Sequence, residues 1–509
     1  MKHIFTFLII FLTLQTVTAQ DRYTSEVFSD AEITVTSNVP YGSNAEIFSM
    51  LFLGATEFLE QTLVMDVYQP DPNIDTERAR PMVLVVHGGD GLPEAVNMTC
   101  VGSKTDQTTV DTARKLARMG YVAVAPSYRQ GWNPLQTQPD LFLDGLVDAA
   151  LRAATDLRTA ARFLRQDIAE NGNTYGIDPD RFSIWGTSTS AGTYSGFATY
   201  VNEEEEVQTE TYFVTDPVTG EVRNVVDLGL NGGLFGLEVG MTADGDTTNY
   251  VNSPGFSSAF QMSALGSAIS LDPGIIDADE PPMIMFGNPV SPVTSVPEGP
   301  IALPTTGMVV ALAQLSRGLI AEANAVGIND VWSNFSFFDD ISQQVADDPI
   351  FMGVEGWLPI YGDPGNVYPW VSWTDCPNAN NPGNLTTFPG ADRAEALIRI
   401  DTMAAYFGVR ACVALNLGCE ATSTADPLVG SDLITISPNP ASDVIVIKSE
   451  RDVPMEAADI LDLNGRLISR NDINGTEAKI RAMGMESGMY NVLIRYEDGV
   501  AVKRIVIQQ

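Results

Sequence analysis

Residues 82–91 read MVLVVHGGDG, a continuously apolar run followed by a glycine-rich loop. An uninterrupted apolar run of this length is typical of a strand covered on both faces of a parallel sheet. Further strands are predicted at 62–68, 121–126 and 181–185, the first of them as an edge or half-exposed strand. Helical patterns lie between them at 109–119 and 141–170. The alternation predicts an α/β fold with a mostly parallel sheet flanked by helices.

Four stretches in this order resemble the α/β-hydrolase fold of carboxylesterases and lipases. They are LVMDVYQP at 63–70, VHGGDG at 86–91, GYVAVAPSYR at 120–129 and YGIDPDR at 175–181. The resemblance covers residues 40–420. It implies that His87, Gly88 and Gly89 form the oxyanion loop, in which backbone N–H groups stabilise developing negative charge and the histidine ring is structural.

The candidate nucleophile elbow is WGTSTSAG at 185–192. Such a turn holds its serine at a strained backbone position and needs small residues two before and two after it. Ser188 has Gly186 before it, but Ser190 stands where glycine is usual. Ser190 has Gly192 after it, but Ser188 stands before it. Because the apolar strand ends at Gly186, Ser188 is the candidate nucleophile and Ser190 the alternative register. A Ser/Thr-rich turn that caps a helix is the competing interpretation.

The rest of a catalytic triad is missing from the sequence. In this fold a carboxylate and then a histidine follow the serine along the chain. The two histidines, His3 and His87, both precede Ser188. Residues 281–287 resemble the strand before the acid loop, yet 288–293 contain no carboxylate. We therefore expect a degenerate hydrolase or binding protein that keeps a pocket for a small ester or hydrophobic ligand.

The alternative is an active serine esterase with Ser188 as nucleophile and a carboxylate in place of the histidine. Glu355 and Asp363 lie where the resemblance places the histidine loop. A carboxylate is a weak base for a serine at neutral pH, although burial raises its pKa.

Residues 1–19 have the pattern of a secretory signal peptide. Lys2 precedes an apolar run from Ile4 to Leu14, and a small-residue cleavage site ends at Ala19. The run is too short for a spanning helix, and no later segment is long enough, so we expect no membrane span. Export favours two disulfides over a zinc site, and no metal or cofactor is expected. The cysteines concerned are Cys100, Cys376, Cys412 and Cys419.

The charge of the chain excludes one class of partner. Lys and Arg number 28 against 65 Asp and Glu, which gives a formal net charge of −37. Phosphate backbones and anionic membrane surfaces are therefore poor partners, and nucleic-acid binding is excluded. Most of the acidity lies before residue 430, where a solvated acidic surface is the preferred interpretation.

The composition changes near residue 425. We expect a hydrolase-like domain at 20–422, a linker at 423–430 and a second domain at 431–509. In that domain, short alternating strands are predicted at 433–437, 444–448, 458–463, 466–469, 490–495 and 500–507. Close spacing of such strands is typical of a small all-β, immunoglobulin-like sandwich.

Four motifs in this tail resemble the C-terminal sorting domain of the type IX secretion system of Bacteroidetes. They are SPNP at 437–440, ILDLNGR at 460–466, SGMY at 487–490 and KR at 503–504. The resemblance implies the type IX machinery as partner. It also implies passage through the periplasm, followed by release or attachment at the outer-membrane surface. An adhesion or sugar-binding sandwich is the alternative for this module.

Overall fold

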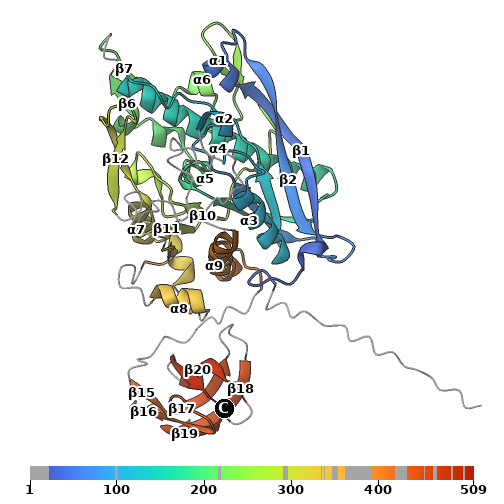
Figure 1. The fold of residues 1–509 in the computed structure, drawn as a ribbon, viewed down its shortest axis with the longest axis vertical. Coiled ribbons are helices and arrows are strands. Elements are labelled where there is room, and N and C mark those ends of the chain that lie inside the picture. Colours follow the sequence, from blue (N-terminus) through green and yellow to red (C-terminus); the bar gives the residue numbers. More distant parts are fainter. Residues whose placement is uncertain are drawn as a thin grey trace, which may run out of the picture.

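The computed structural model describes most of the chain in two bodies of secondary structure (Figure 1). The described residues are 22–97, 101–215, 219–289, 296–333, 335–337, 339–346, 354–361, 393–418, 433–451, 453–461, 467–482, 485, 487–496 and 499–508. The predicted signal peptide and the predicted linker lie outside them. No helix in these ranges combines the length and the apolar character that crossing a membrane requires.

The larger body is built on an eight-stranded sheet with the order β1-β2-β4-β3-β5-β10-β11-β14. Its strands are β1 (Ile33–Glu46), β2 (Leu59–Pro70), β3 (Arg80–Val86), β4 (Val122–Pro126), β5 (Ile177–Gly186), β10 (Met262–Gly266), β11 (Met283–Gly287) and β14 (Trp357–Pro359). β1 with β2 and β2 with β4 pair antiparallel, whereas every later pairing is parallel. The α/β fold with a mostly parallel sheet that was expected from the sequence is confirmed.

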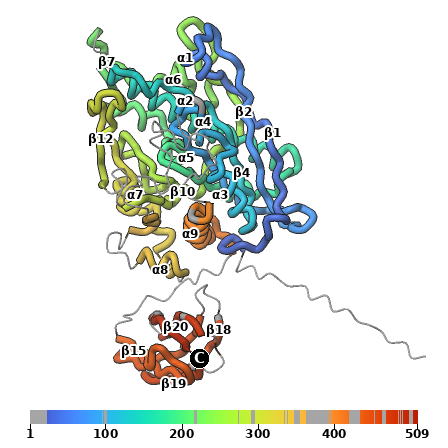
Figure 2. The backbone as a smooth tube through the Cα atoms, viewed as in Figure 1, coloured from blue at the N-terminus to red at the C-terminus, as the bar shows by residue number. Residues whose placement is uncertain are grey.

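Helices cover both faces of this sheet. They are α3 (Gln107–Arg118), α4 (Pro139–Glu170), α5 (Thr189–Tyr200), α7 (Ser316–Val326) and α9 (Arg393–Ala414). Leu84 of β3 packs in one core with α4, α5 and α7, and its neighbour Val85 packs in another with α3 and α9. Figure 2 shows α9 beside α3, although the two are far apart in sequence. The continuous apolar pattern of 82–86 thus reflects burial on both faces.

Shorter elements connect and border these layers. The helices are α1 (Phe48–Phe52), α2 (Glu94–Asn97), α6 (Leu228–Asn231) and α8 (Asp340–Ala346). The 3-10 helices are η1 (Asp30–Glu32), η2 (Glu204–Val207), η3 (Glu210–Tyr212), η4 (Pro273–Ile275) and η5 (Ile328–Trp332). Three antiparallel pairs join β6 (Phe213–Thr215) to β7 (Val222–Asn224), β8 (Gly240–Met241) to β9 (Thr247–Asn249), and β12 (Glu298–Ala302) to β13 (Val309–Gln314).

The position predicted for the 62–68 strand is wrong. β2 is not at the edge, because β1 pairs with it from Ile33↔Pro70 to Glu46↔Leu59. The second half of β2 is buried between β1 and β4, and only its first half is open to solvent. The sequence reasoning missed β1, in which the apolar alternation is confined to residues 33–36 and a polar segment containing proline and glycine follows.

The C-terminal body consists of two antiparallel sheets. One has the order β15 (Ile434–Ser437), β16 (Val444–Ser449), β19 (Glu477–Arg481), and the other β18 (Leu467–Gly475), β17 (Met455–Leu461), β20 (Gly488–Tyr496), β21 (Gly499–Ile507). Residues of both sheets share one apolar core, which confirms the predicted all-β module. Asn439 Nδ2 donates a hydrogen bond to Arg504 O (3.2 Å), so the first and last sequence motifs of this body meet. The strand β19 was not predicted.

Candidate active site

The turn between β5 and α5 lies where the sequence predicts the nucleophile elbow. β5 ends at Gly186, α5 begins at Thr189, and Ser188 is the N-cap residue whose Oγ accepts a hydrogen bond from Ala191 N (3.3 Å). The backbone of Ser188 is extended, with φ −156° and ψ −179°. This conformation is open to any residue and stores no strain. Ser188 therefore lacks the strained backbone expected of a nucleophile elbow and instead caps the helix α5.

Two glycines, six residues apart, explain why each register of the elbow matches only half of the pattern. A Cβ on Gly186 would lie 2.5 Å from Gly192 N, and one on Gly192 would lie 2.6 Å from the carbonyl oxygen of Gly266 in β10. Both positions therefore need glycine for the close packing of β5, α5 and β10. The serines at 188 and 190 lie between these two contacts.

The predicted oxyanion loop lies directly against the turn. A Cβ on Gly88 would come within 2.6 Å of Ser188 Oγ, so the loop and the serine are in contact. Gly89 has φ +103°, and a Cβ there would lie 2.4 Å from Gly102 Cα. The chain thus brings together Gly88 and Ser188, which the sequence separates by a hundred positions.

His87 is buried beneath this loop, and its ring is held by contacts inside the protein. Its Nδ1 lies 2.8 Å from Gly88 O, and because a carbonyl oxygen only accepts, Nδ1 carries the proton. The ring stacks on Tyr128 at a centroid distance of 4.3 Å, and the Tyr128 hydroxyl donates to His87 O (2.9 Å). Burial lowers the pKa of His87 to about 4, so the ring is neutral near neutral pH.

The hydroxyl groups of the two candidate serines have no base as partner in the described part of the chain. Ser188 Oγ lies 3.3 Å from Ser190 Oγ, and Ser190 Oγ accepts from Asp90 N (3.1 Å). Ser188 Oγ also accepts from Ala191 N, and in the contact between the two hydroxyls only one of them can donate to the other. The partner from Asp90 is its backbone N–H and not its carboxylate.

Of the two carboxylates considered as a replacement base, the structure describes Glu355. Glu355 Oε1 lies 2.6 Å from Arg410 Nε of α9 and also accepts from Gly356 N (2.9 Å). It is thus engaged by a cation and a backbone amide. Asp363 lies outside the described residues, as do 290–293 of the expected acid loop, whereas Asn288 is buried.

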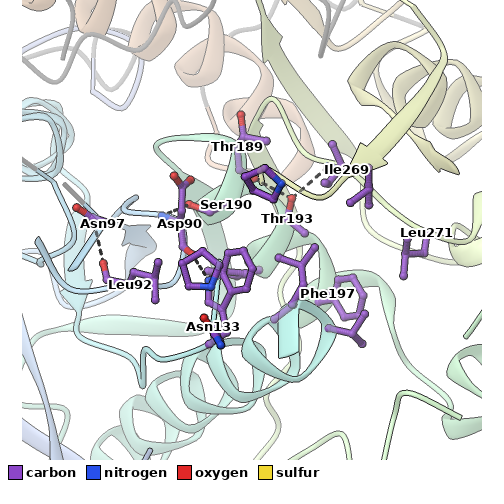
Figure 3. A pocket seen from close by; sticks show the side chains of 18 of the residues that line it. Asp90, Leu92, Asn97, Asn133, Thr189, Ser190, Thr193, Phe197, Ile269 and Leu271 are labelled. Carbon is purple, nitrogen blue, oxygen red and sulfur yellow. Dashed lines mark hydrogen bonds between the residues drawn. The ribbon is translucent and has the colours of Figure 1, made fainter. Parts of the chain in front are cut away.

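Ser190, rather than Ser188, lines a cavity of about 530 Å³ (Figure 3). Ser190, Thr193 and Phe197 stand at helical spacing on one face of α5 and line the cavity together. The opposite walls come from segments 132–135, 269–271 and 301–304. The lining is mostly apolar, with polar side chains of Asp90, Asn97, Asn133, Thr189, Ser190, Thr193 and Ser270 among it.

Asp90 is the residue of this pocket that the sequence reasoning missed. It adopts φ +55°, a left-handed conformation that aspartate tolerates better than most residues. Its backbone is fixed from both sides, since its N–H donates to Ser190 Oγ and its carbonyl accepts from Trp132 Nε1 (2.7 Å). Loss of hydration raises the pKa of its carboxyl group. The one available signal was its place inside the HGGDG run.

The structure describes one of the four cysteines. Cys412 is buried on α9 and carries no free thiol. Cys100, Cys376 and Cys419 lie outside the described residues, so the two disulfides stay a prediction. Within the described ranges, no three His, Cys, Asp or Glu side chains are grouped so that they could hold a metal ion.

Comparison with known proteins identifies the C-terminal module. Residues 435–508 match the secretion system C-terminal sorting domain. This sorting domain implies interaction with the type IX secretion machinery and secretion or attachment at the cell surface. A solved structure of PorZ, a surface component of the type IX secretion system of Porphyromonas gingivalis, is similar over 15% of this chain and 12% of its own, with 24% identity and a TM-score of 0.14.

The larger body is similar to solved structures of an esterase. Thermogutta terrifontis esterase 2 phosphorylated by paraoxon is 14% identical over 52% of this chain and 73% of its own, with a TM-score of 0.29. The same enzyme phosphoramylated by tabun is 14% identical over 59% of this chain and 81% of its own, with a TM-score of 0.31. No curated protein matched the sequence.

Proposed function

We propose that the hydrolase-like body is the cargo of the sorting domain and binds a small ester or hydrophobic ligand without turning it over through a serine nucleophile. The observation that carries this proposal is the set of partners around the two serine hydroxyls. They contact each other and two backbone N–H groups. Neither an imidazole nor a carboxylate is placed to take a proton from them in the described residues.

The energetic consequence of that arrangement is large. Disabling one member of a serine triad lowers turnover about ten-thousandfold, because the hydroxyl remains protonated when it attacks. Oxyanion donors and substrate binding alone retain roughly a thousandfold over water. His87 does not restore the missing step, because no hydrogen bond joins its ring to either serine hydroxyl in the described residues, and burial lowers its pKa to about 4, which makes it a weak base.

The pocket supports ligand binding on its own. Its volume of about 530 Å³ is within the usual range for small-molecule sites, and its walls are mostly apolar. Trp132, Phe197 and Leu271 supply apolar surface, and Ser190 and Asp90 lie together at one side (Figure 3). A ligand with an apolar body and one carbonyl or hydroxyl group fits this distribution.

One observation favours the alternative of an active serine esterase with a non-histidine base. The Asp90 carboxyl lines the same pocket as Ser190, and its raised pKa would make it a better base than an ordinary aspartate. In that case Ser190 would be the nucleophile in place of Ser188. The two functions differ in whether a serine of this pair becomes covalently labelled.

A fluorophosphonate probe distinguishes the two functions. We expect no labelling of the full chain above that of the Ser188→Ala and Ser190→Ala variants. Labelling that either substitution removes would refute the proposal and establish the alternative. Ser333→Ala, an exposed serine of the larger body, is the matched control.

Ligand binding is measured separately with butyrophenone, an aryl ketone that has the apolar body and carbonyl of an ester but cannot be hydrolysed. We expect calorimetric binding that Ala150→Phe abolishes, because Ala150 lines the pocket and a phenyl ring there would fill it. Binding that survives Ala150→Phe, or no binding at all, would contradict the proposed pocket.

A further inference from the structure

A second cavity lies beyond the segment 131–133 that forms one wall of the first. Its volume is about 400 Å³, and Trp132 and Asn133 border both cavities. The other walls come from the β1–β2 connection at 47–58, from α4, and from residues 230, 231 and 248. This volume is also within the range of small-molecule sites.

Two of the charged side chains in this cavity are fully engaged by the protein. Arg129 pairs with Asp156 at 2.9 Å and donates to Thr248 O (2.8 Å) and Asn249 Oδ1 (3.0 Å). Asp144 accepts from both terminal nitrogens of Arg223, at 2.8 and 3.1 Å. The charges of these two groups are therefore balanced within the protein, and Asp144 keeps only the second lone pair of each oxygen for a ligand.

Arg152 is different, because it is buried and incompletely partnered. Its side chain is 9% exposed and donates from one terminal nitrogen to Gly131 O (2.5 Å), and its Nε has no hydrogen-bond partner. In the described part of the chain it forms no ion pair. Nε is enclosed by the protein, whereas Nη1 is not among the enclosed atoms and has no acceptor in the described residues, so a ligand atom in the cavity that accepts from Nη1 would stabilise this cation.

Asp148 offers the complementary group one helical turn away on α4. Its Oδ1 accepts from Asn231 Nδ2 (2.6 Å), and no described residue donates to its Oδ2. It is close enough to Arg152 for mutual electrostatic influence, yet the two form no ion pair. An unused acceptor and an unused donor of opposite charge thus border one cavity without contacting each other.

The chemistry of this pair selects a neutral ligand rich in hydroxyl groups. Arg152 would repel a positively charged ligand, and Asp148 would repel a negatively charged one. A hydroxyl can donate to one and accept from the other at once. Asn133 Nδ2 and Gln136 Nε2 add donors that have no protein acceptor in the described ranges.

Apolar side chains provide the remaining recognition. Ile47, Met50, Phe58 and Leu141 line the same cavity and can pack against the C–H face of a ring. We propose that this cavity is a binding site for a neutral saccharide, distinct from the apolar pocket at Ser190. It does not depend on whether the first pocket binds an ester.

Calorimetric titration of the full chain tests the site with glucose, galactose, mannose, xylose, cellobiose and lactose. We expect at least one of them to bind with a Kd below about 20 mM. Asp148→Asn, which replaces the free acceptor by a donor, should weaken that binding by about tenfold or more. Asp244→Asn, at an exposed loop position, is the matched control and should leave it unchanged.

Further arms make the result specific to this cavity. Glucuronate and glucosamine, the anionic and cationic relatives of glucose, should bind about tenfold more weakly than the best neutral sugar. Gln136→Leu changes a residue outside α4 and should also weaken binding. It tests the site independently of Asp148→Asn, in case that substitution impairs folding. Butyrophenone binding should be the same in Asp148→Asn as in the native chain.

Three outcomes would overturn the site. They are the absence of binding by every sugar tested, a charged sugar that binds better than the neutral ones, and sugar binding that neither Asp148→Asn nor Gln136→Leu alters. The last would place the sugar elsewhere, for example on the C-terminal module. Failure of butyrophenone binding alone would refute the first pocket and leave this one intact.

Discussion

Acidification should destabilise the larger body through a single buried ring, that of His87. The ring is 2% exposed, its Nδ1 is committed to Gly88 O, and burial lowers its pKa from 6.5 to about 4. The unfolded chain exposes the ring to water and restores the ordinary pKa. As the pH falls, the unfolded state therefore takes up a proton before the folded state does, and the folded state loses stability.

The size of the loss follows from the two pKa values. Each pKa unit between folded and unfolded states corresponds to about 1.4 kcal/mol. The stabilising contribution of the neutral His87 ring is fully present above about pH 6.5. About 3 kcal/mol of it has been lost once the pH has fallen through about 4. This is a large part of the stability of an ordinary domain, which is about 5–15 kcal/mol.

Urea unfolding followed by tryptophan fluorescence measures this effect in the right domain, because all 6 tryptophans precede residue 430. Many carboxylates titrate in the same range, so the informative quantity is the difference in unfolding free energy between the native chain and His87→Gln. We expect that difference to change by about 3 kcal/mol between about pH 7 and pH 4. A difference that stays constant across this range would refute the burial of a neutral His87.

Three further predictions follow from the turn and the second cavity. Ser188→Ala should cost about 1 kcal/mol of unfolding free energy through loss of the N-cap of α5, and Ser190→Ala less; equal costs in urea titrations would contradict the capping assignment. Gly186→Ala should cost about 2–3 kcal/mol or prevent folding, because its methyl group would meet the backbone of 191–192; an unchanged melting temperature would count against this packing. Sugar binding should weaken below about pH 6 in calorimetric titrations, since burial raises the pKa of Asp148 to about 6 and protonation removes its charge and turns one of its oxygens into a donor; binding that strengthens on acidification would refute this role. The groups that act on Asp148 are Arg152, Asp144, Asn231 and Asp227.

The fold could be predicted wherever the residues of a strand by themselves show a pattern typical of a strand. The run 82–86 is apolar at every position because alternate residues enter the two cores on either side of the sheet. β1 could not be recognised in this way, since it lies at the edge, is exposed or half-buried at most positions and gains its stability from pairing with β2. β19 is short and half polar, and pairing with β16 determines its place.

The sequence predicted where the candidate site lies, but not which of the two serines lines the pocket. The turn at 185–192 and its contact with Gly88 follow from local motifs, and Gly186 and Gly192 explain the two competing registers. Which serine faces the pocket depends on walls contributed by 132–135, 269–271 and 301–304, whose positions no local pattern encodes. The helical spacing of Ser190, Thr193 and Phe197 was the local sign that this face of α5 lines a cavity.

Hydrolysis of p-nitrophenyl butyrate tests most directly whether the serine pair performs chemistry. The native full chain is compared with the double variant Ser188→Ala/Ser190→Ala at equal concentration, near neutral pH. We predict the same kcat/KM for both, because neither hydroxyl has a base among its partners in the described part of the chain. A double variant that loses about a hundredfold or more of the native rate would contradict the account and show that one of these serines is an active nucleophile.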